Sequence, residues 1–234
     1  MKAEEGAIVS LAEISEIVEL ADVAEMATLT TALPEADRPS GRRHPLPRRQ
    51  EPDRERAVAA VAELLHALGR DTTDVNLRET PRRVADAFIE MLTPREFAMT
   101  TFPNDEGYDE LVVVRDIPFH SLCEHHLLPF QGVAHVGYLP GERILGLSKL
   151  ARTVEHFARN LQVQERLTRQ TADWLQTQLA PRGVGVVIEA EHLCMSLRGA
   201  KSSGSRTRTM TLLGAVKEDR RTREEFFTLC GLPA

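Results

Sequence analysis

The order of helix-forming and strand-forming segments is the feature of this 234-residue chain that most restricts its fold. Apolar side chains at helical spacing predict a helix from about Asp53 to Gly69 and a second helix that begins at Thr80-Pro81, with Thr80 as its cap. The later predicted elements are strands at 111–114 and 133–138, helices at 148–160 and 164–179, strands at 184–190 and 208–213, and a short helix at 223–229. Pairs of strands separated by a pair of helices predict an α+β fold, an antiparallel sheet with its helices gathered on one face.

The first part of the chain differs in composition from the rest. Residues 33–52 interleave prolines with arginines, which is typical of a flexible linker, although the basic run could also be an arm that binds an acidic partner. We therefore divide the chain into an N-terminal extension at 1–52, a helical region at 53–108 and a main folded domain at 109–234.

Composition excludes several classes of protein. The net charge of −6 argues against general affinity for nucleic acid, and no apolar run is long enough to span a membrane. The acidic N-terminal segment does not resemble a secretory leader, so we expect a cytoplasmic location. Three cysteines in such a chain favour metal binding or buried thiols over a disulfide framework.

The candidate metal ligands are Cys123 and His126, which have ligand spacing on a tight turn after a strand, and Cys194, which follows a later strand. Sulfur and imidazole donors together suit Zn²⁺. Cys194 would reach the other two if the first and third strands are neighbours. Three protein ligands would leave a coordination position for water, as in hydrolytic zinc sites. The spacing alone leaves open that both cysteines are core thiols.

Two histidines lie beside these candidate ligands without being needed as donors. His125 precedes His126, and His192 lies two residues before Cys194. Imidazole titrates near neutral pH, so either ring could transfer protons during catalysis. The remaining cysteine, Cys230, follows Phe226 and Phe227 and is predicted to be a core thiol.

A candidate phosphate site lies at the start of the helix after Gly146. Ser148 could cap this helix, and Lys149 and Arg152 would share one face near its positive end. The alternative is an ordinary capped helix with solvated charges. The segment lacks the lysine and hydroxyl order of a P-loop, which argues against a GTPase.

The next helix begins with Gln164-Glu165, and a carboxylate there is favoured by the helix dipole alone. A carboxylate is also the natural acceptor for the two adjacent donors on the guanine edge. Arg198 belongs to a basic segment after Cys194 that suits a polyphosphate, although an exposed basic loop would look the same.

Taken together, these segments closely resemble the GTP cyclohydrolase I family over about residues 57–229. The matching stretches are Glu79-Thr80-Pro81 with Arg83-Val84-Ala85, Cys123-Glu124-His125-His126-Leu127-Leu128-Pro129-Phe130, Gly137-Tyr138-Leu139-Pro140, Gly146-Leu147-Ser148-Lys149-Leu150 with Arg152, Gln162-Val163-Gln164-Glu165-Arg166-Leu167-Thr168, and Glu191-His192-Leu193-Cys194-Met195 with Arg198-Gly199.

The resemblance implies a fold and an assembly. The fold is the tunnelling fold, an antiparallel four-stranded sheet with two helices between its second and third strands, preceded by N-terminal helices, so that 109–234 is the catalytic domain. The assembly is a homodecamer whose active sites form between subunits. The implied activity is hydrolysis of GTP to 7,8-dihydroneopterin triphosphate and formate, the entry to folate-type pterins.

The resemblance also implies roles for individual residues. Zn²⁺ would be held by Cys123, His126 and Cys194, and His125 and His192 would assist proton transfers. Glu165, helped by Gln164, would hold the guanine. The ribose and triphosphate would be engaged by Ser148, Lys149, Arg152 and Arg198, with Arg83 contributed by a neighbouring subunit.

The chain departs from the family pattern in two ways, and two alternative functions remain open. Several bacterial relatives have lysine where this chain has Asp86, which weakens the assignment of Arg83, and the first fifty or so residues have no identified counterpart. One rival is a reductase of the same fold that acts on a deazaguanine with a cysteine nucleophile and lacks this zinc set. The other is a purely structural zinc module, which predicts a fourth ligand and no turnover.

Overall fold

The computed structural model describes residues 51–233, so the predicted extension lies almost entirely outside the described residues. The first helix, α2 (Arg54–Ala67), is capped by Asp53, whose carboxylate accepts a hydrogen bond from the Arg56 amide. It ends as expected before Gly69, which has a left-handed φ of 71°. Helix α3 (Thr80–Leu92) packs against α2. The expected hydroxyl cap by Thr80 is wrong, because Glu79 is the N-cap residue and no side chain bonds to this end.

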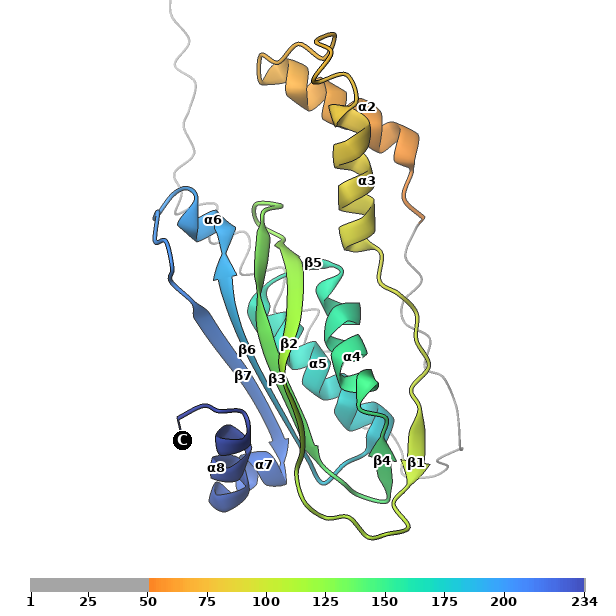
Figure 1. The fold of residues 1–234 in the computed structure, drawn as a ribbon, viewed down its shortest axis with the longest axis vertical. Coiled ribbons are helices and arrows are strands. Elements are labelled where there is room, and N and C mark those ends of the chain that lie inside the picture. Colours follow the sequence, from red (N-terminus) through yellow and green to blue (C-terminus); the bar gives the residue numbers. More distant parts are fainter. Residues whose placement is uncertain (1–50, 234) are drawn as a thin grey trace, which may run out of the picture. The chain divides into compact units, whose positions relative to one another are not determined.

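The main sheet has the strand order β5-β2-β3-β6-β7 (Figure 1). Its four long strands are antiparallel, as predicted, and the two-residue β5 adds a parallel pair at the end of β2. The bounds are β2 Val112–Cys123, β3 Pro129–Leu139, β5 Leu161–Gln162, β6 Gly183–His192 and β7 Thr207–Gly214. A separate two-stranded sheet, which was not predicted, joins β1 (Thr101–Pro103) to β4 (Arg143–Leu145).

Strand β2 is much longer than the predicted segment at 111–114 because a bulge interrupts its pattern. The register with β3 shifts between Val114 and Ile117, and Asp116 has a left-handed φ of 57°. The two polar residues at the bulge interrupt the apolar pattern, so the sequence pattern does not reveal that the strand continues. β2 therefore extends to Cys123, which places a candidate ligand at the end of the sheet.

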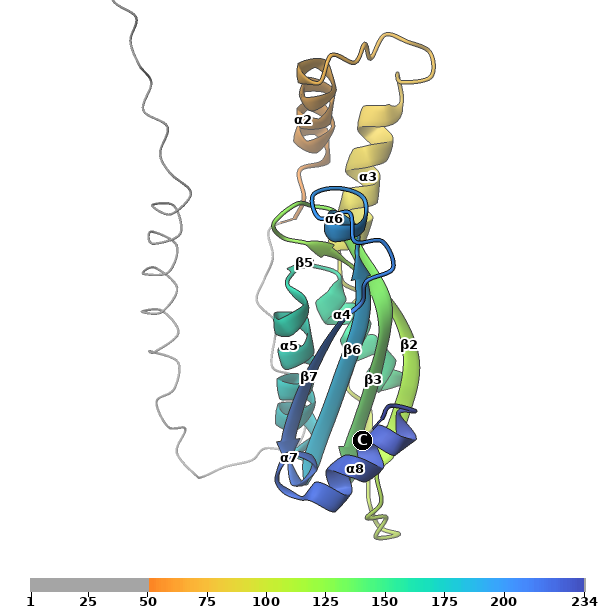
Figure 2. The ribbon, with the colours of Figure 1, turned by 90° about the vertical axis from the view of Figure 1, so that its left-hand side faces the viewer.

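Helices α4 (Ser148–Ala158) and α5 (Gln164–Leu179) lie between β3 and β6 in sequence and cover one face of the sheet (Figure 2). This confirms the two helices expected between the second and third long strands. The core between the layers is apolar, and its fully buried members include Leu150, Val154, Leu167, Leu175, Ala134, Val136, Val186 and Ile188. The chain therefore has the α+β architecture of the tunnelling fold.

The C-terminal helices depart from the expectation that all helices gather on one face. After the short α6 (Leu193–Ser196) and α7 (Ala215–Glu218), α8 (Arg220–Leu229) packs on the sheet face opposite α4 and α5. Its buried Phe226 ring lies over Gly137 and Gly185, and a Cβ at Gly185 would stand 2.6 Å from that ring. Two glycines side by side thus leave room for this helix, and Cys230 is buried beside it, as predicted.

Among the helices of residues 51–233, none combines the length and apolar character that a bilayer crossing requires.

Candidate metal centre and active site

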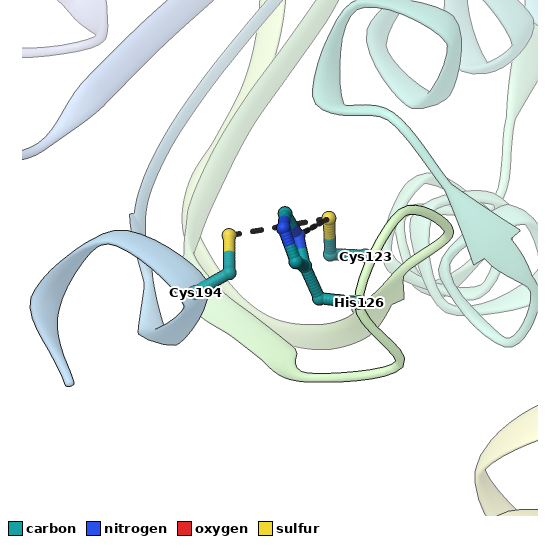
Figure 3. Close-up of side chains that lie close together, drawn as sticks. All are labelled: Cys123, His126 and Cys194. Carbon is teal, nitrogen blue, oxygen red and sulfur yellow. Dashed lines mark hydrogen bonds between the residues drawn. The ribbon is translucent and has the colours of Figure 1, made fainter. Parts of the chain in front are cut away.

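Three predicted ligands meet at one end of the sheet (Figure 3). Their donor atoms all lie within 4.8 Å of one another, with Cys123 Sγ 3.7 Å from His126 Nδ1 and 4.0 Å from Cys194 Sγ. Cys123 ends β2, His126 lies in the turn to β3, and Cys194 lies in α6 directly after β6. The convergence predicted from the sequence is therefore present in the structure.

The route by which Cys194 reaches this group differs from the expected one. The strands β2 and β6 are not neighbours, because β3 lies between them. The turn after β2 is closed by the amide of Cys123, which donates to Leu128 O at 2.9 Å, and by a left-handed φ of 54° at Leu127. This turn and α6 bring their ligands together at the end of β3, where Phe130 pairs with Ser121 of β2 and with His192 of β6.

The group has the chemistry of a site for a soft divalent cation. Both thiols are buried, while His126 is exposed. Burial and the adjacent Cys123 raise the pKa of the Cys194 thiol, so two thiolates this close call for a compensating cation. Zn²⁺ accepts such a combination of two sulfurs and one imidazole. His125 Nδ1 also lies 3.7 Å from Cys123 Sγ. His125 is not one of the three residues whose donor atoms all lie within 4.8 Å of one another.

The turn that carries both histidines is held by a contact that the sequence did not suggest. Arg166 of α5 donates to the Glu124 carboxylate, and also to Gln162 Oε1 at 2.9 Å and Leu161 O at 3.0 Å. The Glu124 amide donates to Gln162 O at 3.1 Å. The start of α5 thus fixes the position of the turn. The two charged residues lie 42 positions apart, and only the pairing of β5 with β2 places them together.

His192 lies at the end of β6 and is restrained on two sides. Its ring stacks on the buried Phe130 ring, with centroids 4.6 Å apart and planes 2° apart. Its Nε2 lies 2.8 Å from Gln164 Oε1. Burial lowers the pKa of His192, and the charge of Glu165 opposes part of that effect. Glu165 itself is exposed at the start of α5, where a ligand could reach it.

Gln164, in contrast, is 1% exposed and directs its amide into the protein. The amide nitrogen contacts Ile188 O, Thr207 O and Thr209 Oγ1, and the amide oxygen contacts His192. The predicted contact between Gln164 and guanine stays a prediction, and in this structure both ends of the side-chain amide are already engaged within the protein.

The predicted phosphate residues of α4 lie at the other end of the sheet. Leu145, just before α4, donates its amide to the Tyr138 hydroxyl, and Tyr138 pairs with the first residue of β2. The last residue of α4 accepts a hydrogen bond from Ser121, close to Cys123. Ser148, Lys149 and Arg152 thus belong to the end of α4 that points away from the metal group of the same chain. The expected cap by Ser148 is wrong, because Leu147 is the N-cap residue and no side chain bonds to it.

The two remaining predicted residues are both exposed arginines. Arg198 follows α6, and its charge acts on Cys194, so it lies on the metal side of the molecule. Arg83 lies on α3 beside Arg82. The nearby Asp86 carboxylate is engaged by Arg54 at 2.6 Å and 2.9 Å and by Arg82 at 3.4 Å, which lowers the pKa of Asp86.

Comparison with known proteins identifies the family of this chain. A family model described as GTP cyclohydrolase I matches residues 57–231. The chain is 52% identical over 177 residues to GTP cyclohydrolase 1 of Aquifex aeolicus, with 76% of this chain and 96% of the relative covered. It is 50% identical over 177 residues to GTP cyclohydrolase 1 of Hydrogenobaculum sp., covering 76% and 97%, and 53% identical over 184 residues to that of Mycolicibacterium vanbaalenii, covering 76% and 90%.

Each of these alignments spans nearly the whole of the relative, and the family model covers the turn after β2 together with α5 and α6. The chain belongs to the GTP cyclohydrolase I family.

Proposed function

We propose that this enzyme hydrolyses GTP to 7,8-dihydroneopterin triphosphate and formate, the first step of folate-type pterin synthesis. The observation that carries the proposal is the convergence of Cys123, His126 and Cys194 in a chain of this family. Formation of the product requires addition of water to C8, hydrolysis of the resulting formamide, and rearrangement of the ribose with a ring closure that releases one water. It also requires proton donors at the nitrogen atoms that are released.

Cys123, His126 and Cys194 would hold Zn²⁺, because two thiols and one imidazole within 4.8 Å match its preferred donors. When bound by these three residues, Zn²⁺ would supply Lewis acidity for the activation of water. The structural alternative, a zinc module without turnover, needs a fourth protein ligand. Within residues 51–233 the candidate metal site has three protein ligands, which supports the enzymatic interpretation.

The two neighbouring imidazoles are the proposed proton carriers. When water adds to C8, N7 of the purine gains a proton, and an imidazole at hydrogen-bond distance can deliver it. The C8–N9 bond then opens, and a second water releases C8 as formate. His125 lies beside the metal group, and His192 is fixed at the end of β6 by Phe130 and Gln164. Fixed orientation lowers the entropic part of the barrier to such transfers.

The remaining residues would bind the substrate. Glu165, exposed at the start of α5, would accept hydrogen bonds from N1–H and the 2-amino group of guanine. Arg198 would bind the triphosphate from the metal side of the molecule. Because Ser148, Lys149 and Arg152 lie at the far end of α4, we propose that these residues complete the site of another subunit.

The proposed assembly is therefore a homo-oligomer, and a decamer in line with the family resemblance. Arg83 would join a neighbouring site in the same way. Asp86 does not present an uncompensated negative charge there, because Arg54 and Arg82 engage its carboxylate. This supports retaining Arg83 as a phosphate ligand, although Asp86 stands where several relatives have lysine.

Incubation of the purified protein with GTP tests the proposal directly. Formate should appear together with neopterin fluorescence after oxidation and dephosphorylation. Cys123→Ala should lose both bound zinc and turnover, whereas Cys230→Ala, which changes the cysteine outside the metal group, should keep both. A wild-type protein that binds zinc tightly and releases no formate would rule out the enzymatic function and favour the structural module.

A further inference from the structure

The buried side-chain amide of Gln164 makes four hydrogen-bond contacts beside the candidate metal group. Gln164 is the first residue of α5, and its amide nitrogen lies 3.0 Å from Ile188 O, 3.0 Å from Thr207 O and 3.1 Å from Thr209 Oγ1. These acceptors belong to β6 and β7. Turning the side chain outward toward a ligand would break these hydrogen bonds, which is costly for a buried amide.

These contacts fix which end of the amide faces His192. Carbonyl oxygens only accept hydrogen bonds, so the NH₂ group must point to Ile188 and Thr207. The reverse orientation would set Oε1 against two oxygens at 3.0 Å. Oε1 therefore faces His192 Nε2 at 2.8 Å, and because Oε1 only accepts, Nε2 must carry the hydrogen.

The ring of His192 is consequently held in one orientation and one tautomer. Phe130 stacks on its face, and Gln164 binds its Nε2–H edge. This leaves Nδ1 as the ring nitrogen that is not engaged by Gln164. The arrangement is the one used wherever a fixed acceptor orients a catalytic imidazole by binding its other nitrogen.

We propose that Gln164 is a positioning residue for His192, acting through the ring and not through contact with guanine. This inference rests on the proposed function, because it assigns the tautomer of a histidine that the proposed reaction uses. It separates the neighbours Gln164 and Glu165: the buried amide acts on the chemical step, and the exposed carboxylate acts on substrate binding.

The test uses zinc-loaded full-length protein with Gln164→Met, which keeps the length of the side chain but removes its hydrogen bonds. The kcat for formate release should fall by about tenfold or more, while KM for GTP stays within about twofold. In a His192→Ala background, Gln164→Met should cause no further loss. Thr171→Val is the matched control, because Thr171 is buried on the same helix and its hydroxyl donates to Leu167 O within that helix.

Two kinetic results would overturn the inference. A raised KM with normal kcat would return Gln164 to guanine binding, and losses that multiply in the double variant would show that Gln164 acts independently of His192. A crystal structure of Gln164→Met provides a readout that does not need turnover, and it should show the His192 ring turned or divided between orientations. An unmoved ring would refute the inference even if the wild type made no formate, whereas absence of formate alone would refute only the proposed function.

Discussion

Cys123 and Lys149 should serve the same active site only when they come from different copies of the chain. Helix α4 has 11 residues and is therefore about 16 Å long. Its last residue lies beside Ser121, whereas Lys149 lies at the opposite end of the helix. Buried side chains of α4 fill the space between Cys123 and Lys149 of one chain. One ligand therefore cannot reach both residues through the interior of that chain.

Complementation measures this arrangement. We expect Cys123→Ala and Lys149→Glu each to lack activity alone, the first through loss of metal and the second through repulsion of the triphosphate. If the two variants carry different affinity tags and are expressed together in equal amounts, random assembly puts an intact Cys123 opposite an intact Lys149 in about one quarter of sites. Particles purified through both tags should therefore release formate at about a quarter of the wild-type rate.

One control calibrates this experiment, and one outcome would contradict the prediction. Cys123→Ala expressed with wild type should keep about half of the sites, which calibrates the mixing. Doubly tagged particles without any activity would show that Lys149 acts within its own chain, and the proposal of a site shared between subunits would then be wrong.

Three further outcomes are expected. Glu165→Ala should raise KM for GTP by roughly 10- to 100-fold with a smaller effect on kcat, since it removes a charged acceptor, and steady-state kinetics with unchanged KM would exclude it from guanine recognition. Burial raises the pKa of Cys230 to about 12, so this thiol should resist alkylation at pH 8 until the protein unfolds, as peptide mass spectrometry can show; rapid labelling of the native protein would contradict its burial. Phe226→Ala should lower the free energy of unfolding by about 3–5 kcal/mol in denaturant titrations, against less than about 1 kcal/mol for the exposed Leu229→Ala, and equal effects would disprove the packing of α8.

The sequence was most informative where one residue type has one dominant chemistry or one clear period. Helix α5 begins and ends where its apolar period predicted, at Gln164 and Leu179. The ligand set Cys123, His126 and Cys194 followed from the donor preferences of zinc, and the structure brings these residues together. The bounds of α5 depend on local pattern and the choice of ligands on intrinsic chemistry, whereas the expected route of Cys194 depended on the strand order and was wrong.

Features that depend on strand order were beyond the sequence. The contact of Arg166 with Glu124 spans 42 positions, and that of His192 with Gln164 spans 28, so no local pattern marks either of them. The resemblance implied that Gln164 helps to bind guanine, but the burial of this side chain depends on β6 and β7 passing beside α5. Helix caps at Thr80 and Ser148 were wrong because the residue before each already occupies the cap position.

The packing of Phe226 against two glycines restricts which substitutions this family can accept. The ring fills the space that side chains at Gly137 and Gly185 would need, although the three residues belong to two strands and a distant helix. Mutations at these positions should therefore be accepted in combination and not singly. Relatives with alanine at the position of Gly185 are expected to carry a smaller side chain in place of Phe226, so that the three alignment columns covary.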